Sequence, residues 1–220
     1  MFRLSANTRI LILAFVYMFP ASAMSDTLAR AASTDSPTSR MSVPLADEAH
    51  GVARKHSGSA FLLSYRGKTF VVSNAHVVLN AGVTNQFFIQ VEEQWVPLPA
   101  RWKFTNTADI AAIDISTLVR SERAGVLRTE TADLVAGQTA LAALCNPLLF
   151  KDPIIGIFNQ DEGVDLEVRF LGKNLAPFCS GAPLVDNAGR VRGIVFGRIE
   201  GYGYALPART IVRFLDEKFF

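Results

Sequence analysis

Short apolar runs separated by turn residues recur along the chain from about Gly51 onward, and this pattern is typical of β-strands. The runs over 59–65 and 69–73 flank a turn at 66–68, which predicts a β-hairpin. At the C-terminus, apolar residues at helical spacing predict a short amphipathic helix over 208–219. Further strands are predicted over 86–91, 94–98, 110–115, 138–144, 154–158, 164–170, 184–185 and 191–196. Repeated short strands predict an all-β domain, either a sandwich or a barrel.

The first 23 residues have the pattern of a secretory signal peptide. Arg3 and Arg9 precede an apolar stretch over 10–19, and Ala21-Ser22-Ala23 has the small-x-small pattern of a cleavage site. The apolar stretch is shorter than the roughly 20 residues that span a bilayer, so we predict cleavage after Ala23 and export to the periplasm or the medium, with an uncleaved anchor as the alternative. Residues 24–47 are rich in Ser, Thr, Ala and Pro and are predicted to be a flexible leader, which leaves 48–220 as the folded domain.

Removal of the signal peptide changes the charge of the chain. The full sequence has 22 basic and 20 acidic residues. Because two basic residues and no acidic ones lie in the first 23, the mature chain has no net charge. We therefore expect neither nucleic acid nor, after cleavage, a membrane as a partner. The two cysteines and three histidines lack the spacing of a zinc site, and neither a metal nor a cofactor is expected.

Three segments contain residues suited to acyl transfer. His76 follows a predicted strand, Asp109 precedes another, and Ser180 is followed by small residues. Each alone has a commoner structural explanation, but their order matches one known arrangement of a catalytic triad. In that chemistry a histidine takes the proton of a weak serine nucleophile and a carboxylate orients the imidazole. Backbone N–H groups in the tight turn after the serine would stabilise the oxyanion.

The sequence around these residues resembles the trypsin-like serine peptidases, and within them the HtrA/Deg-like bacterial branch. The resemblance is collinear from about residue 52 to residue 215 and implies two packed six-stranded antiparallel β-barrels, over about 50–120 and 135–208, with the site between them. No PDZ-like domain is expected to follow. The matching motifs are Gly58-Ser-Ala-Phe61, Ser73-Asn-Ala-His76-Val-Val, Ala108-Asp109-Ile-Ala-Ala-Ile, Leu144-Cys145-Asn146-Pro147-Leu148, Ser180-Gly-Ala-Pro-Leu-Val and Tyr204-Ala-Leu-Pro207.

The resemblance implies a serine endopeptidase with Ser180 as nucleophile, His76 as base and Asp109 as orienting acid, acting on a protein or peptide substrate. It places the oxyanion hole at the N–H groups of Phe178 and Ser180, although the family has glycine at the position of Phe178. A side chain there costs about 1–2 kcal/mol if the backbone conformation of the glycine is kept. This departure motivates the alternative of a catalytically weak or inactive binding module with the same fold. An unrelated exported β-sandwich binding protein is a third hypothesis.

The resemblance also concerns the surroundings of the site. Cys145 and Cys179 occupy positions that lie close together in the family, so we expect a disulfide between them, with two buried thiols as the alternative. The specificity pocket is expected around Asn174, Phe196 and Arg198. Because Asn174 is uncharged, a strict preference for a substrate Lys or Arg is not supported. Arg198 at the edge of the pocket would favour an acidic or polar substrate residue; the alternative is that Arg198 is an ordinary surface arginine.

Overall fold

The computed structural model describes residues 42–48, 55–82, 86–91, 94–105, 107–119, 126–137, 139–161, 165–170, 175–199 and 202–220. The predicted signal peptide, most of the predicted leader and Asn174 lie outside these residues. In chain order the elements are β1 (Ser42–Glu48), β2 (Lys55–Tyr65), β3 (Lys68–Ser73), α2 (Ala75–Ala81), β4 (Gln86–Val91), β5 (Gln94–Pro97), β6 (Lys103–Phe104), β7 (Ala111–Asp114), β8 (Ala140–Ala143), β9 (Ile154–Asp161), β10 (Leu166–Phe170), β11 (Pro183–Val185), β12 (Val191–Ile199), β13 (Tyr202–Pro207) and α3 (Ala208–Phe219). Every strand predicted from the sequence overlaps an observed strand, and the predicted C-terminal helix is present. No helix in the described ranges is long and apolar enough to cross a membrane.

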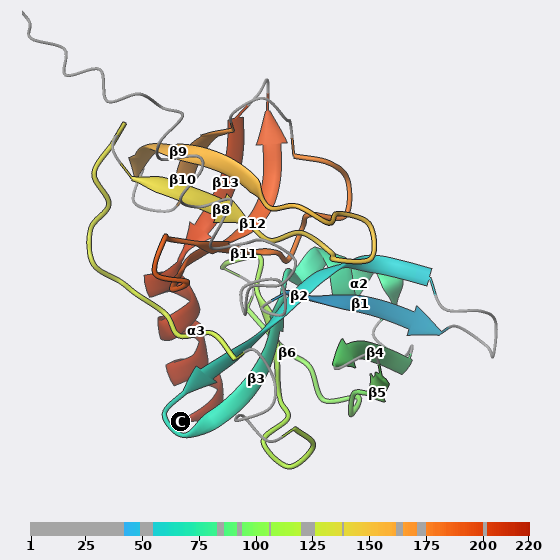
Figure 1. Ribbon diagram of the computed structural model, residues 1–220. Coiled ribbons are helices and arrows are strands. Elements are labelled where there is room, and N and C mark those ends of the chain that lie inside the picture. Colours follow the sequence, from blue (N-terminus) through green and yellow to red (C-terminus); the bar gives the residue numbers. More distant parts are fainter. Residues whose placement is uncertain are drawn as a thin grey trace, which may run out of the picture.

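The strands form two units that follow one another along the chain (Figure 1). The first is a seven-stranded sheet in the order β5-β4-β1-β2-β3-β7-β6, and the second is a closed barrel in the order β10-β13-β12-β11-β8-β9. The prediction of a six-stranded barrel is therefore confirmed for the second unit. In the first unit the described strands number seven and form an open sheet, so the prediction of two six-stranded barrels is not confirmed as a whole.

The predicted start of the folded domain at residue 48 is wrong, because β1 begins at Ser42. This strand pairs with β2 on one side and with β4 on the other, so it is an interior strand of the first sheet. Its Leu45 is fully buried in the core of that unit. The surrounding sequence is rich in small and polar residues and gives no strand signal of its own. Pairing on both edges and burial of one leucine, rather than local propensity, account for the strand.

Three clusters of buried apolar side chains make up the core of the protein. One fills the first unit and one fills the barrel of the second unit. The third cluster contains side chains of both units and of α3, among them Phe61, Phe70, Ile194, Ile211 and Phe214. Because these residues are withdrawn from water only when the two units and the helix come together, this shared cluster holds the units against each other.

The segment that connects the two units, here called the linking segment (126–135), is hydrogen-bonded to both. The N–H of Leu127 donates to the carbonyl oxygen of Leu62 in β2 at 2.9 Å. Further along, the N–H of Glu130 donates to the carbonyl oxygen of Val191, the first residue of β12, at 2.9 Å. The linking segment thus extends the hydrogen bonding of the first sheet and of the second barrel.

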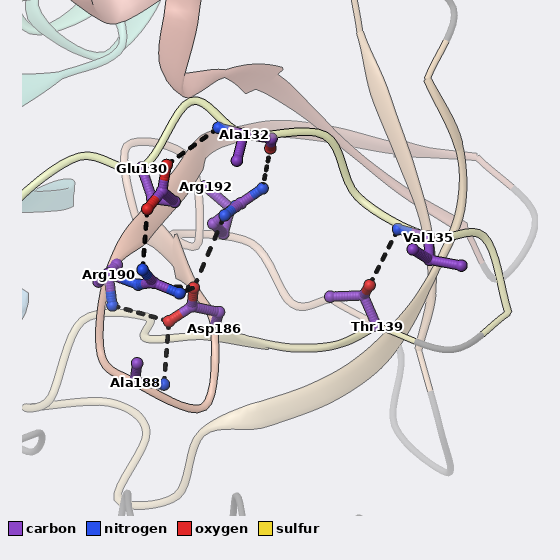
Figure 2. A network of polar contacts seen from close by, with 8 residues as sticks. All are labelled: Glu130, Ala132, Val135, Thr139, Asp186, Ala188, Arg190 and Arg192. Atoms are coloured by element: carbon purple, nitrogen blue, oxygen red, sulfur yellow. Dashed lines mark hydrogen bonds and ion pairs between the residues drawn. The ribbon is translucent and has the colours of Figure 1, made fainter.

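Charged side chains also fasten the linking segment to the β11–β12 hairpin (Figure 2). Arg190 Nη1 lies 2.8 Å from Glu130 Oε2, and Arg190 Nε donates to Asp186 Oδ2 at 3.2 Å. The buried Arg192 donates to the carbonyl oxygen of Ala132 and lies 3.8 Å from Asp186 Oδ2. The pKa of the Glu130 carboxyl is lowered, chiefly because the backbone N–H of Ala132 donates a hydrogen bond to it. Burial of the carboxyl raises this pKa, and the positive charges of Arg190 and Arg192 lower it further. Side-chain contacts therefore add to the backbone hydrogen bonds that attach the linking segment to the second unit.

Candidate active site

His76 lies in the first turn of α2, directly after β3. The sequence predicts a histidine just past a strand, and this is confirmed, but it does not predict the helix. Val77 and Val78 are buried in the core of the first unit and fix the orientation of α2. Before the helix, the buried Asn74 donates from Nδ2 to the carbonyl oxygen of Asp109 at 2.8 Å. The imidazole itself is partly exposed, with 40% of its side-chain surface accessible.

Asp109 receives two contacts from His76. Its Oδ2 lies 2.5 Å from His76 Nδ1, and its Oδ1 accepts the backbone N–H of His76 at 2.8 Å. The register of the first sheet explains the approach, because Ser73 at the end of β3 is opposite Ala111 at the start of β7. A carboxylate oxygen at Nδ1 favours the tautomer of the imidazole in which Nδ1 donates to Asp109.

Ser180 lies in the turn that leads into β11 and is partly buried. The N–H of Ser59 donates to its carbonyl oxygen at 3.0 Å, and the next N–H, that of Gly181, donates to the carbonyl oxygen of Val195 at 2.9 Å. A Cβ atom on Gly58 would lie 2.9 Å from Val77 Cγ1 and 3.2 Å from the carbonyl oxygen of Ser180. The helix that carries His76 and the turn that carries Ser180 therefore both lie against Gly58 of β2.

Phe178 has a φ of 73°, in the left-handed region that favours glycine. A residue with a side chain loses roughly 1–2 kcal/mol there relative to a right-handed conformation. The carbonyl oxygen of Phe178 accepts a 2.7 Å hydrogen bond from the hydroxyl of Ser59, and its side chain is 47% exposed. The resemblance predicts a cost at this position if the backbone keeps the conformation of a glycine, and the backbone does adopt a left-handed conformation.

Cys145 and Cys179 form a disulfide, as expected, with their Cα atoms 4.6 Å apart. Both residues are buried. The bond joins the turn before Ser180 to the loop that starts at Cys145. The next residue in that loop, Asn146, donates from Nδ2 to the carbonyl oxygen of Gly58 at 3.0 Å. The turn and the loop are therefore fixed to each other covalently and are each hydrogen-bonded to β2.

A cavity of about 140 Å³ adjoins Ser180. Arg198 lines it, and Arg198 Nη1 donates to the carbonyl oxygen of Leu175 at 2.5 Å. Phe196 is absent from the described lining, contrary to the prediction, because it packs on the core cluster shared by the two units. Asn174, the third residue predicted for this pocket, lies outside the described residues. The lining consists of Leu175, Ala176, Pro177, Cys179, Ser180, Val195, Gly197 and Arg198.

Ser59 and Asn146 contribute contacts to the site that were not predicted from the sequence. Both lie in motifs that carry the family resemblance, Gly58-Ser-Ala-Phe61 and Leu144-Cys145-Asn146-Pro147-Leu148. That resemblance was the available signal, but it assigned no role to either side chain. Their contacts span 119 and 88 residues of sequence, which no local pattern can indicate.

Comparison with known proteins gives the class of fold. No protein-family model matches the sequence, and no curated protein matches it. Among solved structures the chain is similar to an HtrA-type protease, AlgW with a decapeptide, with 17% identity, a TM-score of 0.64 and coverage of 84% of this chain and 68% of the other. It is also similar to the serine endoprotease from Yersinia pestis, with 18% identity, a TM-score of 0.65 and coverage of 87% of this chain and 65% of the other.

The protein has the fold of a trypsin-like serine protease of the HtrA type. The resemblance seen in the sequence motifs is therefore confirmed at the level of fold. The chain spans about two thirds of the length of each of these two proteins. The hypothesis of an unrelated β-sandwich is wrong, because the second unit is a closed barrel and 84% of the chain superposes on a protease of this fold.

Proposed function

We propose that the protein is an exported serine endopeptidase in which Ser180 is the nucleophile, His76 the general base and Asp109 the orienting acid. The observation that carries the proposal is that both carboxylate oxygens of Asp109 contact His76. The helix that carries His76 and the turn that carries Ser180 both pack against Gly58. A carboxylate that accepts the Nδ1 proton orients the ring so that Nε2 is the nitrogen that can act as the base.

The reaction follows from these roles. His76 Nε2 takes the proton of the Ser180 hydroxyl as Oγ attacks the carbonyl carbon of the scissile bond. The negative charge that develops on the substrate oxygen is stabilised by the N–H groups of Phe178 and Ser180. His76 then returns the proton to the leaving amine, which departs and leaves an acyl-enzyme. A water molecule, deprotonated in turn by His76, hydrolyses the acyl-enzyme and restores Ser180.

The alternative of an inactive binding module rests on Phe178. Its left-handed conformation favours the enzyme, because the backbone there takes the conformation that suits a glycine in spite of the phenyl side chain. This backbone conformation and the paired His76 and Asp109 are both features that the proposed catalysis uses. We therefore favour catalysis over binding alone.

A fluorophosphonate probe tests the proposal directly. We expect the probe to form a covalent bond with Ser180 in the mature protein, which peptide mass spectrometry would locate. The Ser180→Ala variant is the matched control, because it removes one oxygen atom and leaves the turn intact. Absence of labelling of the wild-type protein, in both the oxidised and the reduced state, would contradict the enzyme and favour the binding module.

Export is part of the same proposal. A disulfide between Cys145 and Cys179 supports it, because such bonds persist in oxidising compartments. We expect N-terminal sequencing of the exported protein to return Met24, and a sequence starting at Met1 would contradict cleavage after Ala23. A peptide or protein substrate is the expected partner, and the decapeptide named with AlgW supports this only by analogy of fold.

We further propose that the cavity beside Ser180 takes the side chain that precedes the scissile bond, and that Arg198 gives it a preference for acidic residues. Arg198 is the only charged residue in the described lining, and the contact of Nη1 with Leu175 anchors the guanidinium there. The remaining N–H groups of the guanidinium are available as donors to a carboxylate.

The Arg198→Ala variant tests this preference. We expect kcat/KM for a peptide with Glu before the scissile bond to fall about tenfold, the lower end of the range for hydrogen bonds to charged groups. The same peptide with Val at that position serves as the control and should be cleaved at an unchanged rate. An equal effect on both peptides would show that Arg198 acts on the structure of the pocket and not on the charge of the substrate.

A further inference from the structure

Ser59 bonds to both residues that flank Cys179 in the nucleophile turn. Its side-chain hydroxyl donates to the carbonyl oxygen of Phe178 at 2.7 Å, and its backbone N–H donates to the carbonyl oxygen of Ser180 at 3.0 Å. The residue is fully buried in β2 and is separated from Phe178 by 119 positions. A single residue of the first unit therefore fixes the backbone of the second unit's nucleophile turn at two residues, Phe178 and Ser180.

Ser59 is itself held rigidly. The hydroxyl of Ser73 in β3 donates to the carbonyl oxygen of Ser59 at 2.8 Å, and both residues are fully buried. A Cβ atom on Gly181, whose φ is 87°, would lie only 2.1 Å from that same carbonyl oxygen. The strand and the turn thus approach so closely that only glycine fits between them, and Ser59 cannot shift without moving the turn.

The bond to Phe178 acts on the strained part of the turn. The carbonyl oxygen of Phe178 belongs to the peptide unit that joins it to Cys179, so the Ser59 hydroxyl fixes the plane of that unit. The disulfide fixes Cys179 from the other side. A residue with a side chain stays in the left-handed region only where its surroundings impose that conformation. Without the hydroxyl, Phe178 can relax to a negative φ, and this rotation about the N–Cα bond would change the direction of its N–H.

We propose that Ser59 is a positioning residue for the oxyanion hole: its hydroxyl holds Phe178 in the left-handed conformation that directs the Phe178 N–H toward the substrate carbonyl. The inference rests on the proposed function. Ser59 does not touch the substrate and acts through Phe178 alone. It explains how this chain keeps an oxyanion hole without the glycine that the family has at this position.

The test is a double-mutant cycle of Ser59→Ala and Phe178→Gly, measured by the rate of covalent labelling with a fluorophosphonate and by peptide hydrolysis. We expect Ser59→Ala alone to lower the labelling rate and kcat by about 10- to 100-fold with little change in KM, which is less than the roughly 10²–10³-fold loss of a whole oxyanion donor. In the Phe178→Gly background the same substitution should cost less than about threefold, because glycine adopts a positive φ without help.

A matched control separates positioning from general stability. Ser116 hydrogen-bonds through its hydroxyl to the backbone N–H of Thr69 at 3.0 Å, 47 residues away and at the end of β3 opposite to Ser73. We expect Ser116→Ala to leave kcat unchanged. Ser59→Ala with wild-type kcat, or an equal loss in both backgrounds of the cycle, would overturn the proposal.

Crystal structures of the variants give a readout that is independent of activity. We expect φ of Phe178 to be negative in Ser59→Ala and positive in the wild type. A positive φ in the variant would overturn the role of Ser59 even if the protein is an active protease. A wild-type protein that resists labelling would refute the proposed function, while the φ of Phe178 would still decide whether Ser59 imposes the backbone conformation. If Ser59→Ala does not fold alone, recovery of folding in the Phe178→Gly background supports the proposal, and failure in both backgrounds overturns it.

Discussion

Replacement of Asp109 by asparagine is expected to lower kcat by about four orders of magnitude, the loss known for the same change in this kind of triad. The contacts of the carboxylate explain why. Oδ1 accepts the backbone N–H of His76, and Oδ2 faces His76 Nδ1. In asparagine the single oxygen must serve the backbone N–H, so the amide NH₂ faces Nδ1. The imidazole is then held with its proton on Nε2, and it cannot accept the proton of Ser180.

Steady-state hydrolysis of a peptide substrate would measure this effect, with circular dichroism to show that the variant is folded. Asp114→Asn is the matched control. Asp114 is the last residue of β7, the strand that follows Asp109, and its carboxylate pairs with Lys68 at 3.3 Å and not with the histidine. The control should retain kcat within about twofold, as expected for a surface pair. If Asp109→Asn kept a tenth or more of the wild-type kcat, Asp109 would not be the residue that sets the tautomer of His76.

Removal of the disulfide, by the double substitution Cys145→Ala and Cys179→Ala, is expected to lower the free energy of unfolding by about 4 kcal/mol. The two cysteines are 34 positions apart, and closing a loop of this length restricts the unfolded chain by about that amount in the chain-entropy account. For a domain of this size the Tm should fall by roughly 7–15 °C. The native contacts of the loop and the turn with β2 remain, so the variant should still fold.

Thermal and urea unfolding would measure the loss, with the wild-type protein under a strong thiol reductant as a second route to the same state. The reduced wild type and the double variant should unfold at similar temperatures, and the variant should not respond to the reductant. A Tm unchanged by either treatment would mean that the bond is absent from the exported protein or that the unfolded chain gains little freedom without it.

Most strands could be predicted from the sequence because each contains a run of apolar residues between turn signals. The two-residue strand β6 is too short to give such a signal, and β13 was indicated only by the motif that ends in Pro207. For β1 and α2 the local sequence gives no signal or the opposite one. β1 has one buried leucine, Leu45, and owes its conformation to strands on both sides of it. In α2 the β-branched pair Val77 and Val78 favours a strand by local propensity. Packing of both valines in the core of the first unit imposes the helix instead.

In the candidate site, too, some residues could be predicted from the sequence, and others depend on contacts made only in the fold. The order of His76, Asp109 and Ser180 along the chain indicated which side chains could meet, and the structure brings His76 and Asp109 into contact. The disulfide came from comparison of motifs and not from spacing. Phe196 packs on the shared core cluster, at an irregularity in the pairing of β12 with β13. Neither local propensity nor residue order indicates which face of β12 meets the cavity.

The linking segment has a consequence for how the protein accommodates a substrate. Its backbone pairs with β2 through Leu127 and with β12 through Glu130, so it offers no free joint about which the two units could swing. Hinge motion requires a few residues that can absorb large changes in φ and ψ, and residues bonded on both sides cannot do so. We expect the two units to move as one body and to unfold in a single transition. For the proposed peptidase, adaptation to different substrates would then come from the residues that line the cavity beside Ser180 and not from a change in the angle between the units.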